Sequence, residues 1–230
     1  MAFYACIPAR GGSKRIPHKN IKDFLGKPLI SYPITAALES GVFEDVIVST
    51  DDDEIASVAK NVGASVPFMR SKELADDFTG TFAVTVDAYK QLVNLGKKVD
   101  GICCIYATTP LINQLYLKKA FDDFVKSKKD VLCSVCEFPF PIQRAFIIND
   151  DGCLEYREPK FAMSRSQDLT KTYQDCGLFY FYSASVLETG KSNGSIPFIM
   201  PRHRVIDIDT PEDWDVACAM AKVVKELNLE

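Results

Sequence analysis

Short apolar runs alternate with amphipathic stretches along most of the chain. The runs carry apolar and β-branched residues on both sides, which is typical of strands buried on both faces; they cover 3–8, 46–50, 66–70, 101–107 and 130–138. Between them, apolar residues recur at helical spacing over 28–40, 51–62, 84–95 and 114–127. The pattern predicts an α/β fold with a mostly parallel sheet between two layers of helices. In such a fold, ligands bind beyond the carboxyl ends of the strands.

The pattern changes between residues 138 and 173. Prolines interrupt the start of this segment, and two β-like runs then flank an Asn-Asp-Asp-Gly turn at 149–152, which predicts a hairpin. Strand-like runs resume at 177–183, 196–200 and 204–209. The last helix is expected to begin after Thr210, with Asp213 completing a capping box. Because no linker or internal repeat is visible, we expect one domain over 1–230, with 138–173 as an excursion from it.

Composition and charge argue against several classes of protein. The formal net charge is −4, whereas general nucleic-acid binders carry a basic surface. No apolar run reaches the roughly 18–20 residues of a membrane helix, and the N-terminus lacks the basic leader of a signal peptide. We therefore expect a cytoplasmic protein that binds neither nucleic acid nor membranes. Cys133 and Cys136 form an isolated CxxC pair, which we interpret as core packing rather than as a metal or redox site.

The segment 7–20, after the first expected strand, concentrates positive charge. Six basic residues and one acid lie between Arg10 and Lys27. Gly11 and Gly12 allow the backbone to approach a ligand closely, and the exposed N–H groups of such loops bind anions. The loop matches neither the dinucleotide-binding nor the Walker fingerprint. It therefore predicts a cradle for a polyphosphate, and the alternative is a solvated basic loop.

Two groups of acidic residues are candidate cation ligands. Asp207 and Asp209 alternate along an expected strand, so their carboxylates would share one face and repel each other unless a cation neutralised them. Mg²⁺ binds such carboxylates together with substrate phosphates, although one of the two could simply cap the next helix. The acids at 51–53 need no further role, because acidic residues favour a helix start. A polyphosphate loop beside a Mg²⁺ site indicates nucleotidyl or phosphoryl transfer.

Several motifs resemble one enzyme family over essentially the whole chain. IPARGGSKRIPHKN, VIVSTDDDEIA and DIDTPEDW are similar to motifs of the Rossmann-like nucleotidyltransferases that make CMP-activated nonulosonic acids, the family of the CMP-sialic acid synthetases. ELADDFTGT, CIYATTP, FPFPIQRAF and SRSQDL resemble the branch of that family that acts on pseudaminic acid. The resemblance implies Mg²⁺-dependent transfer of CMP from CTP to the anomeric hydroxyl of a nonulosonic acid, with release of pyrophosphate.

The resemblance also implies roles for individual residues. Arg10 and Lys19 would bind the triphosphate and act in catalysis, with Asp209 as the candidate base. Asp207 and Asp209 would hold Mg²⁺. The other nucleotide-binding candidates are Gly11, Gly12, Ser13, Asn20, Arg70, Thr79, Gly80 and Thr81.

The segment 138–173 corresponds to the dimerisation arm of that family, which reaches the active site of the partner, so a homodimer is implied. The sugar-site candidates on it are Gln143, Arg144, Arg165 and Gln167. Tyr106 stands where sialic acid synthetases carry a glutamine, and 174–177 replaces their Arg-Pro-Asn-Gly stretch. Both changes favour pseudaminic acid over N-acetylneuraminic acid. Legionaminic or N-acetylneuraminic acid is the alternative substrate, and a non-catalytic nucleotide-binding or interaction protein is the alternative of a different class.

Overall fold

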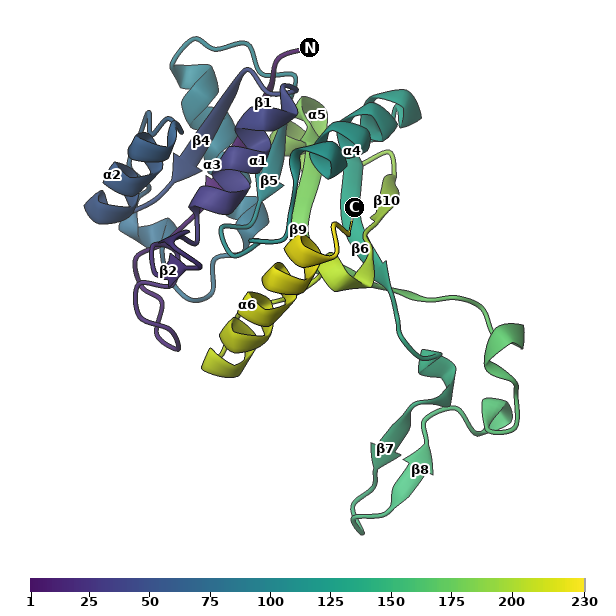
Figure 1. The fold of residues 1–230 in the computed structure, drawn as a ribbon. Coiled ribbons are helices and arrows are strands. Elements are labelled where there is room, and N and C mark those ends of the chain that lie inside the picture. Colours follow the sequence, from purple (N-terminus) through teal and green to yellow (C-terminus); the bar gives the residue numbers. More distant parts are fainter. Residues whose placement is uncertain (230) are drawn as a thin grey trace.

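A six-stranded sheet runs through the middle of the molecule in the computed structural model, which describes residues 1–229 (Figure 1). The strand order is β10-β6-β9-β5-β1-β4. The strands are β1 (Phe3–Pro8), β4 (Asp45–Ser49), β5 (Gly101–Ile105), β6 (Val131–Glu137), β9 (Tyr173–Ser183) and β10 (Ser195–Ile199). Only β9 runs antiparallel to its neighbours, and the other pairings are parallel. The expected mostly parallel sheet is confirmed.

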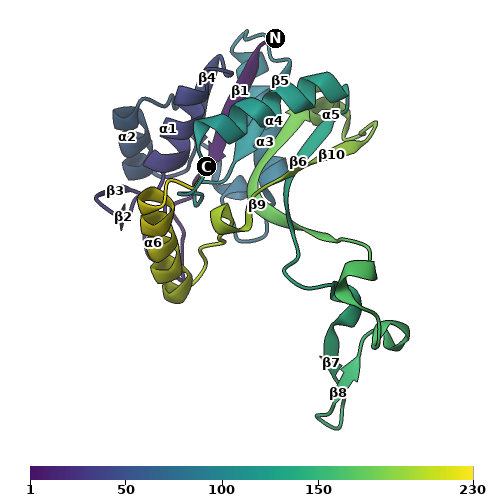
Figure 2. The ribbon, with the colours of Figure 1, turned by 45° about the vertical axis from the view of Figure 1, so that its right-hand side comes forward.

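Helices cover both faces of this sheet. They are α1 (Ser31–Ser40), α2 (Asp53–Val62), α3 (Thr81–Asn94), α4 (Gln114–Ser127) and α5 (Ala184–Thr189). α1, α2 and α4 pack on one face, and α3 and α5 pack on the other (Figure 2). Along β1, Phe3, Ala5 and Ile7 join the first core, whereas Tyr4 and Cys6 join the second. Both faces of the strand are therefore buried, which explains its unbroken apolar sequence.

Smaller elements lie outside the sheet. Two short hairpins are β2 (Asp23–Phe24) with β3 (Lys27–Pro28) and β7 (Phe146–Ile148) with β8 (Leu154–Tyr156). The 3-10 helices are Lys72–Leu74, Ile142–Arg144, Pro159–Phe161, Ser166–Asp168 and Arg202–Arg204. Because β3 includes Pro28, the first helix begins at Ser31, later than expected.

The expected strand over 66–70 does not form, and that prediction is wrong. Ser65 makes one isolated bridge with Ile47, beyond the edge strand β4. Pro67 has no N–H to donate, so the ladder does not continue. The N–H of Arg70 instead donates to the Thr50 carbonyl at 2.8 Å, which brings Arg70 to the carboxyl end of β4.

The expected strand over 204–209 is also absent. This segment follows the 3-10 helix Arg202–Arg204 and reaches the last helix without sheet partners. Ile208 is fully buried in a separate cluster with Trp214, so packing against the last helix replaces strand pairing. The argument that Asp207 and Asp209 share one face of a strand therefore does not hold.

The last helix, α6 (Pro211–Glu226), packs against the loop that follows β1. Its N-terminus has the expected capping box between Thr210 and Asp213. The ring of Trp214 packs edge-on against Phe24, with 5.5 Å between the ring centroids. These contacts place the turn before α6 beside the basic loop. Among the helices of residues 1–229, none has the length and apolar character needed to cross a bilayer.

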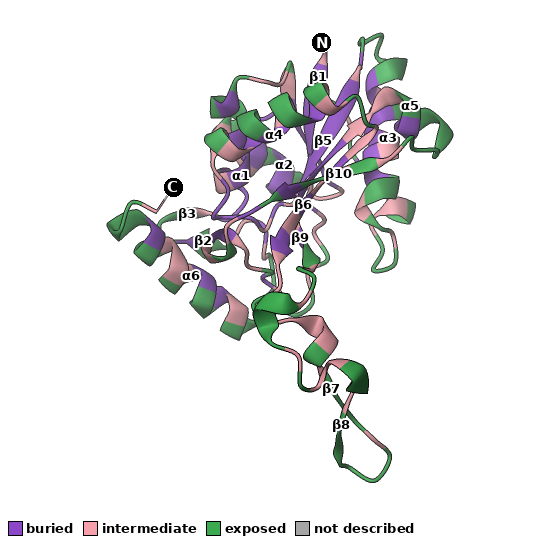
Figure 3. Ribbon diagram, turned by 90° about the vertical axis from the view of Figure 1, so that its right-hand side faces the viewer, coloured by how far each residue is buried: buried purple, intermediate pink, exposed green. Residues whose placement is uncertain are grey.

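Residues 138–172 leave the body between β6 and β9 as a long arm (Figure 1). The predicted hairpin is confirmed, since β7 and β8 pair antiparallel near the end of the arm. Buried residues concentrate in the sheet and on the inner sides of the helices, whereas the arm is largely exposed (Figure 3).

Candidate active site

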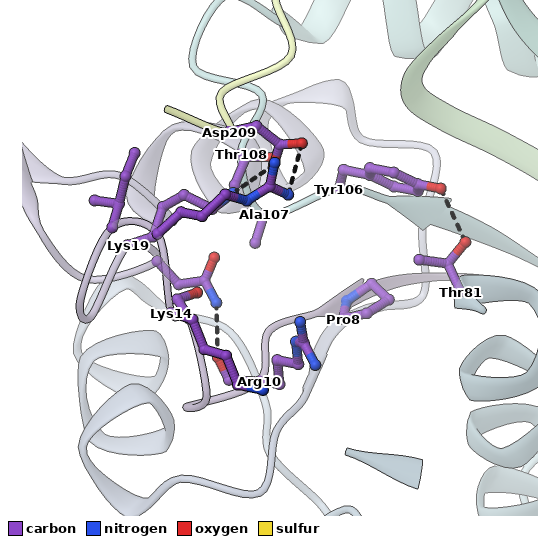
Figure 4. Close-up of a pocket in the computed structure, with 13 residues that line it drawn as sticks. Pro8, Arg10, Lys14, Lys19, Thr81, Tyr106, Ala107, Thr108 and Asp209 are labelled. Carbon is purple, nitrogen blue, oxygen red and sulfur yellow. Dashed lines mark hydrogen bonds and ion pairs between the residues drawn. The ribbon is translucent and has the colours of Figure 1, made fainter. Parts of the chain in front are cut away.

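A cavity of about 240 Å³ opens at the carboxyl ends of β1 and β5 (Figure 4). It is bounded by the loop after β1, the start of α3, the segment after β5 and the turn before α6. The lining residues are Pro8, Arg10, Ser13, Lys14, Arg15, Ile16, Lys19, Asn20, Thr81, Tyr106, Ala107, Thr108 and Asp209. The fold thus brings seven of the expected site residues together, namely Arg10, Ser13, Lys19, Asn20, Thr81, Tyr106 and Asp209.

One side of the cavity is an ion cluster around Asp209. Lys19 Nζ donates to the Ile208 carbonyl at 2.5 Å and lies 3.3 Å from Asp209 Oδ1. Arg15 Nη2 lies 2.9 Å from Asp209 Oδ2. Each carboxylate oxygen of Asp209 therefore faces one cation. Arg15 was part of the basic loop in the sequence but carried no assigned role there; its contact with Asp209 depends on the position of α6.

A second ion cluster lies across the same loop. Arg10 Nη1 is 2.7 Å from Asp77 Oδ1, and Lys14 Nζ is 2.5 Å from Asp77 Oδ2. Arg10 also donates to the Asp76 carbonyl at 2.6 Å. Hydrogen bonds from Lys14 and Arg10 hold the pKa of Asp77 below its usual range. The Asp77 carboxylate is therefore ionised and paired with Arg10 and Lys14, so an anionic ligand of these two cations would compete with it.

The glycines of the loop differ in what they require. A Cβ on Gly11 would lie 2.5 Å from Asp52 Oδ2, so the close approach to α2 demands glycine there. Gly11 N–H donates to Asp51 Oδ1 at 3.1 Å, and the side chain of Asp52 caps α2, which confirms a helix-start role for Asp52. Gly12 has open space around it, and neither glycine lines the cavity. Asn20 secures the loop, because its side-chain amide donates to the Arg10 carbonyl at 3.0 Å.

Arg70 is a buried guanidinium with an incomplete set of partners. Its side chain is 3% exposed and its nearest carboxylate, Asp51, is 3.7 Å away. The Nε and Nη2 atoms of Arg70 have no hydrogen-bond partner within residues 1–229. Burial lowers the pKa of the guanidinium, an effect that Asp51 opposes. A buried donor left unpaired costs free energy, which favours a polar ligand that reaches this residue.

Asp207 lies outside the cavity lining and is exposed. Surrounding protein reduces the hydration of its carboxylate, and the charge of Asp209 adds to this, so the pKa of Asp207 is raised. No strand aligns the carboxylates of Asp207 and Asp209. Across the described 229 residues, no group of three or more His, Cys, Asp or Glu side chains is arranged to hold a metal ion. Of the CxxC pair, Cys136 is packed in the core.

The opposite side of the cavity carries no charge. Thr81 Oγ1 and the Tyr106 hydroxyl are 3.0 Å apart, at the start of α3 and after β5 (Figure 4). Thr79 and Gly80 lie in the loop directly before α3, which also carries Asp77, and they do not line the cavity. The Thr79 N–H donates to Asp76 Oδ1 at 2.6 Å, which helps to shape that loop.

None of the four arm candidates lines the cavity of its own chain. Figure 2 shows the arm leading away from the sheet and its helices. Gln143 Nε2 donates to the Thr170 carbonyl at 2.9 Å, and Arg165 Nε donates to Asp168 Oδ2 at 2.8 Å. Arg144 contacts Ser166 at 3.4 Å. Gln167 lines a hollow within the arm itself.

The sequence of this chain is similar to the sequences of known cytidylyltransferases. The chain matches the family described as cytidylyltransferase over residues 4–199. It is 47% identical over 224 residues to a pseudaminic acid cytidylyltransferase of Campylobacter jejuni, covering 96% of each chain. It is 32% identical over 234 residues to a CMP-N,N'-diacetyllegionaminic acid synthase of Legionella pneumophila, covering 100% of this chain and 99% of the other.

A solved structure has the same fold at low identity. It is the CMP:2-keto-3-deoxy-manno-octonic acid synthetase complexed with CTP, with a TM-score of 0.70 and 18% identity, covering 96% of this chain and 99% of the other. At this identity the likeness shows the shared fold.

Proposed function

The chain belongs to the cytidylyltransferase family, and from this premise we propose that it transfers CMP from CTP to a nonulosonic acid, with pseudaminic acid as the substrate. It is a nucleotidyltransferase. The observation that carries the proposal is the division of the cavity. Four cationic side chains and Asp209 line one side, and the uncharged residues Thr81 and Tyr106 line the other. Such a cavity suits a polyphosphate on the cationic side and uncharged polar groups of a substrate, such as hydroxyl and amide groups, on the other.

The charged residues of the cavity have two roles in the proposed reaction. Arg10, Lys14, Arg15 and Lys19 bind the triphosphate and neutralise the charge that develops as pyrophosphate leaves. The anomeric oxygen of the sugar attacks the α-phosphorus, a new P–O bond forms, and the bond to pyrophosphate breaks. Asp209 accepts the proton from the anomeric hydroxyl, because it is the carboxylate that lines the cavity. Lys19 and Arg15, on either side, hold this carboxylate in place.

The nucleoside end has its own candidates. Arg70 brings unpaired, buried N–H donors to the carboxyl end of β4, and a cytosine carbonyl would supply the missing acceptor. Thr79 and Gly80 would shape the same subsite through the loop that Asp76 organises. Ser13 lines the cavity and would offer a donor to the phosphates, whereas Gly11, Gly12 and Asn20 would shape the phosphate loop.

The residues present also fit a Mg²⁺ ion. Asp207 and Asp209 would hold it together with phosphate oxygens, since Mg²⁺ in phosphate sites takes one or two carboxylates from the protein. The two residues are separated by one position in the segment directly before α6, which supports this assignment. Bound there, Mg²⁺ would supply further neutralisation of phosphate charge.

We also propose that the protein is a cytoplasmic homodimer whose arms cover each other's cavities. The arm exposes apolar side chains that a single chain does not cover, including Phe140 at 79%, Ile148 at 73% and Met163 at 95%. Gln143, Arg144, Arg165 and Gln167 would then contact the sugar in the partner's cavity. A cytoplasmic location agrees with the use of CTP as substrate.

The sugar is tested by comparing kcat/KM for pseudaminic, N,N'-diacetyllegionaminic and N-acetylneuraminic acids at saturating CTP and Mg²⁺. We expect pseudaminic acid to be preferred at least tenfold, since unpaired polar groups and mismatched stereocentres cost on the order of 1–3 kcal/mol. Equal or better use of N-acetylneuraminic acid would refute the choice of sugar but not cytidylyl transfer. Binding of CTP without turnover of any of the three acids would instead favour a non-catalytic nucleotide-binding protein.

A further inference from the structure

Arg204 is a second buried guanidinium, and it lies outside the lining of the cavity. The residue is 9% exposed and ends the 3-10 helix Arg202–Arg204. Its Nη1 donates to the Leu111 carbonyl at 2.9 Å, and its Nη2 donates to the Leu229 carbonyl. The guanidinium carbon lies 5.6 Å from the centroid of the Tyr116 ring on α4. Arg204 therefore joins parts of the chain that are far apart in the sequence.

The bond to Leu111 leads to one side of the cavity. Leu111 belongs to the segment that follows β5, and residues 106–108 of this segment line the cavity. Within the segment, Thr109 Oγ1 donates to the Tyr106 carbonyl at 2.8 Å, and Thr109 is 2% exposed. The segment is therefore a compact, buried turn, so a contact at Leu111 also restrains the residues that line the cavity.

The bond to Leu229 leads to the opposite side of the cavity. Arg204 begins the segment 204–209, and Asp209 at the end of this segment lines the cavity. At the N-terminus of α6, Asp213 accepts the N–H of Asp209 at 3.1 Å, and Leu229 follows the C-terminus of the same helix. Because Arg204 bonds to Leu229, the start of the segment is tied to the far end of the helix. The segment and the helix thus form a closed loop that turns at Asp209.

The guanidinium group suits this connection. Its N–H donors lie in one rigid plane, so two carbonyls bound to Nη1 and Nη2 have a fixed relative position. Within residues 1–229, the segment 204–209 belongs to no strand, so no β ladder fixes it instead. The bond to Leu111 is buried, and breaking it would leave a carbonyl and an N–H unpaired away from water. The arrangement therefore resists displacement of either segment.

We propose that Arg204 is a positioning residue for the reaction: it fixes the segment 106–111 and the turn that carries Asp209 relative to each other across the cavity. This inference rests on the proposed cytidylyl transfer. Arg204 does not line the cavity, so it acts through the residues that do. The cationic loop has a support of its own, the bond from Asn20 to the Arg10 carbonyl, so binding of the triphosphate should not depend on Arg204.

The test compares Arg204→Met and Arg204→Lys with the unaltered chain, using CTP, Mg²⁺ and pseudaminic acid. Arg204→Met keeps an apolar stem without donors. It should lower kcat about 10- to 100-fold, because displacements of about 1 Å have such effects, and should leave the Kd for CTP from calorimetry within about threefold. Arg204→Lys keeps the charge and a donor without the planar fork, so it should recover part of the lost kcat.

The matched control is Arg202→Met, which removes an exposed arginine from the same 3-10 helix and should leave the kinetics unchanged. Circular dichroism and thermal unfolding measure whether each variant folds. Hydrogen exchange followed by mass spectrometry should be faster in segments 106–112 and 205–210 of Arg204→Met, well below its unfolding temperature, and unchanged in β1. If Arg204→Met does not fold, Arg204→Lys replaces it, and its kcat should still lie several-fold below that of the unaltered chain.

The outcomes separate positioning from folding and from the proposed function. Unchanged kcat in a folded Arg204→Met variant, or in Arg204→Lys where it replaces that variant, would overturn the positioning role alone. Equal falls in kcat and in CTP affinity, in proportion to the loss of folded protein, would overturn it as well, since they would show a purely structural residue. No CMP-sugar from the unaltered chain with any nonulosonic acid would overturn both proposals.

Discussion

Lys19 is fixed by the Ile208 carbonyl and the Asp209 carboxylate, and its side chain is only 16% exposed. It is therefore preorganised beside the phosphates that the proposed reaction brings. Lys19→Ala should lower kcat about 100- to 1000-fold, the usual effect of removing one charge-stabilising group. Steady-state kinetics and circular dichroism measure this. Lys27→Ala removes the same charge outside the cavity and should be unaffected. Near-normal turnover by a folded Lys19→Ala variant would show that the loop has another purpose.

Asp77 competes with phosphate for Arg10 and Lys14. Asp77→Asn frees both cations, so the KM for CTP should fall about two- to fivefold, a modest change because the pairs are partly exposed. The effect should weaken as salt rises, since screening reduces the original competition. A rise in the KM for CTP would mean instead that Asp77 positions Arg10 for the triphosphate.

For single residues, the sequence indicated which side chains gather at the cavity better than it indicated which ion pairs they form. The cluster of basic residues after the first strand led to the prediction of an anion site. Such a cluster is stable only if acidic side chains or a bound anion neutralise its charge. The pairing of Lys19 with Asp209 joins positions 190 apart in the sequence, and only the packing of α6 creates it. The incomplete pairing of Arg70 likewise depends on burial, which a sequence does not show.

The N-terminus of α6 connects local helix chemistry to the site. Asp213 Oδ2 accepts the backbone N–H of Asp209 at 3.1 Å as well as that of Thr210 at 2.7 Å. Thr210→Ala should lower the free energy of unfolding by about 1 kcal/mol, as for other N-caps, and should also reduce kcat because Asp209 is less well held. Urea unfolding and kinetics measure both, with Thr35→Ala on α1 as the control. A loss of stability with unchanged kcat would separate the cap from the site.

Elements with local causes were predictable, and those that depend on neighbours were not. The capping box and the arm hairpin are encoded by a few adjacent residues, and both formed as expected. The segments 66–70 and 204–209 have strand-like sequences, but the first continues past the edge strand through Pro67 and the second packs under Trp214. Apolar composition indicates burial, and it does not distinguish a strand from an extended packed segment.

The molecule as a whole consists of a three-layer body and an arm, and the apolar side chains of the arm are exposed to solvent in the single chain. If the arm forms the proposed dimer, Ile148→Asp should convert it to a monomer and lower the activity, because the partner's arm would no longer complete each cavity. Thermal unfolding of the body should change little, since Ile148 is 73% exposed. Sedimentation velocity measures the change. Lys97→Asp places a carboxylate on an exposed loop of the body and should stay dimeric. An Ile148→Asp dimer with full activity would contradict this use of the arm.

Cytidylyl transfer is the central claim, and the product formed from CTP and pseudaminic acid with Mg²⁺ tests it most directly. Phosphorus NMR and mass spectrometry of the reaction should show one pyrophosphate released for each CMP-sugar formed, with both absent when the acid is left out. The Lys19→Ala variant should form this product far more slowly. Release of inorganic phosphate and CDP, or consumption of CTP without a CMP-sugar, would contradict the account.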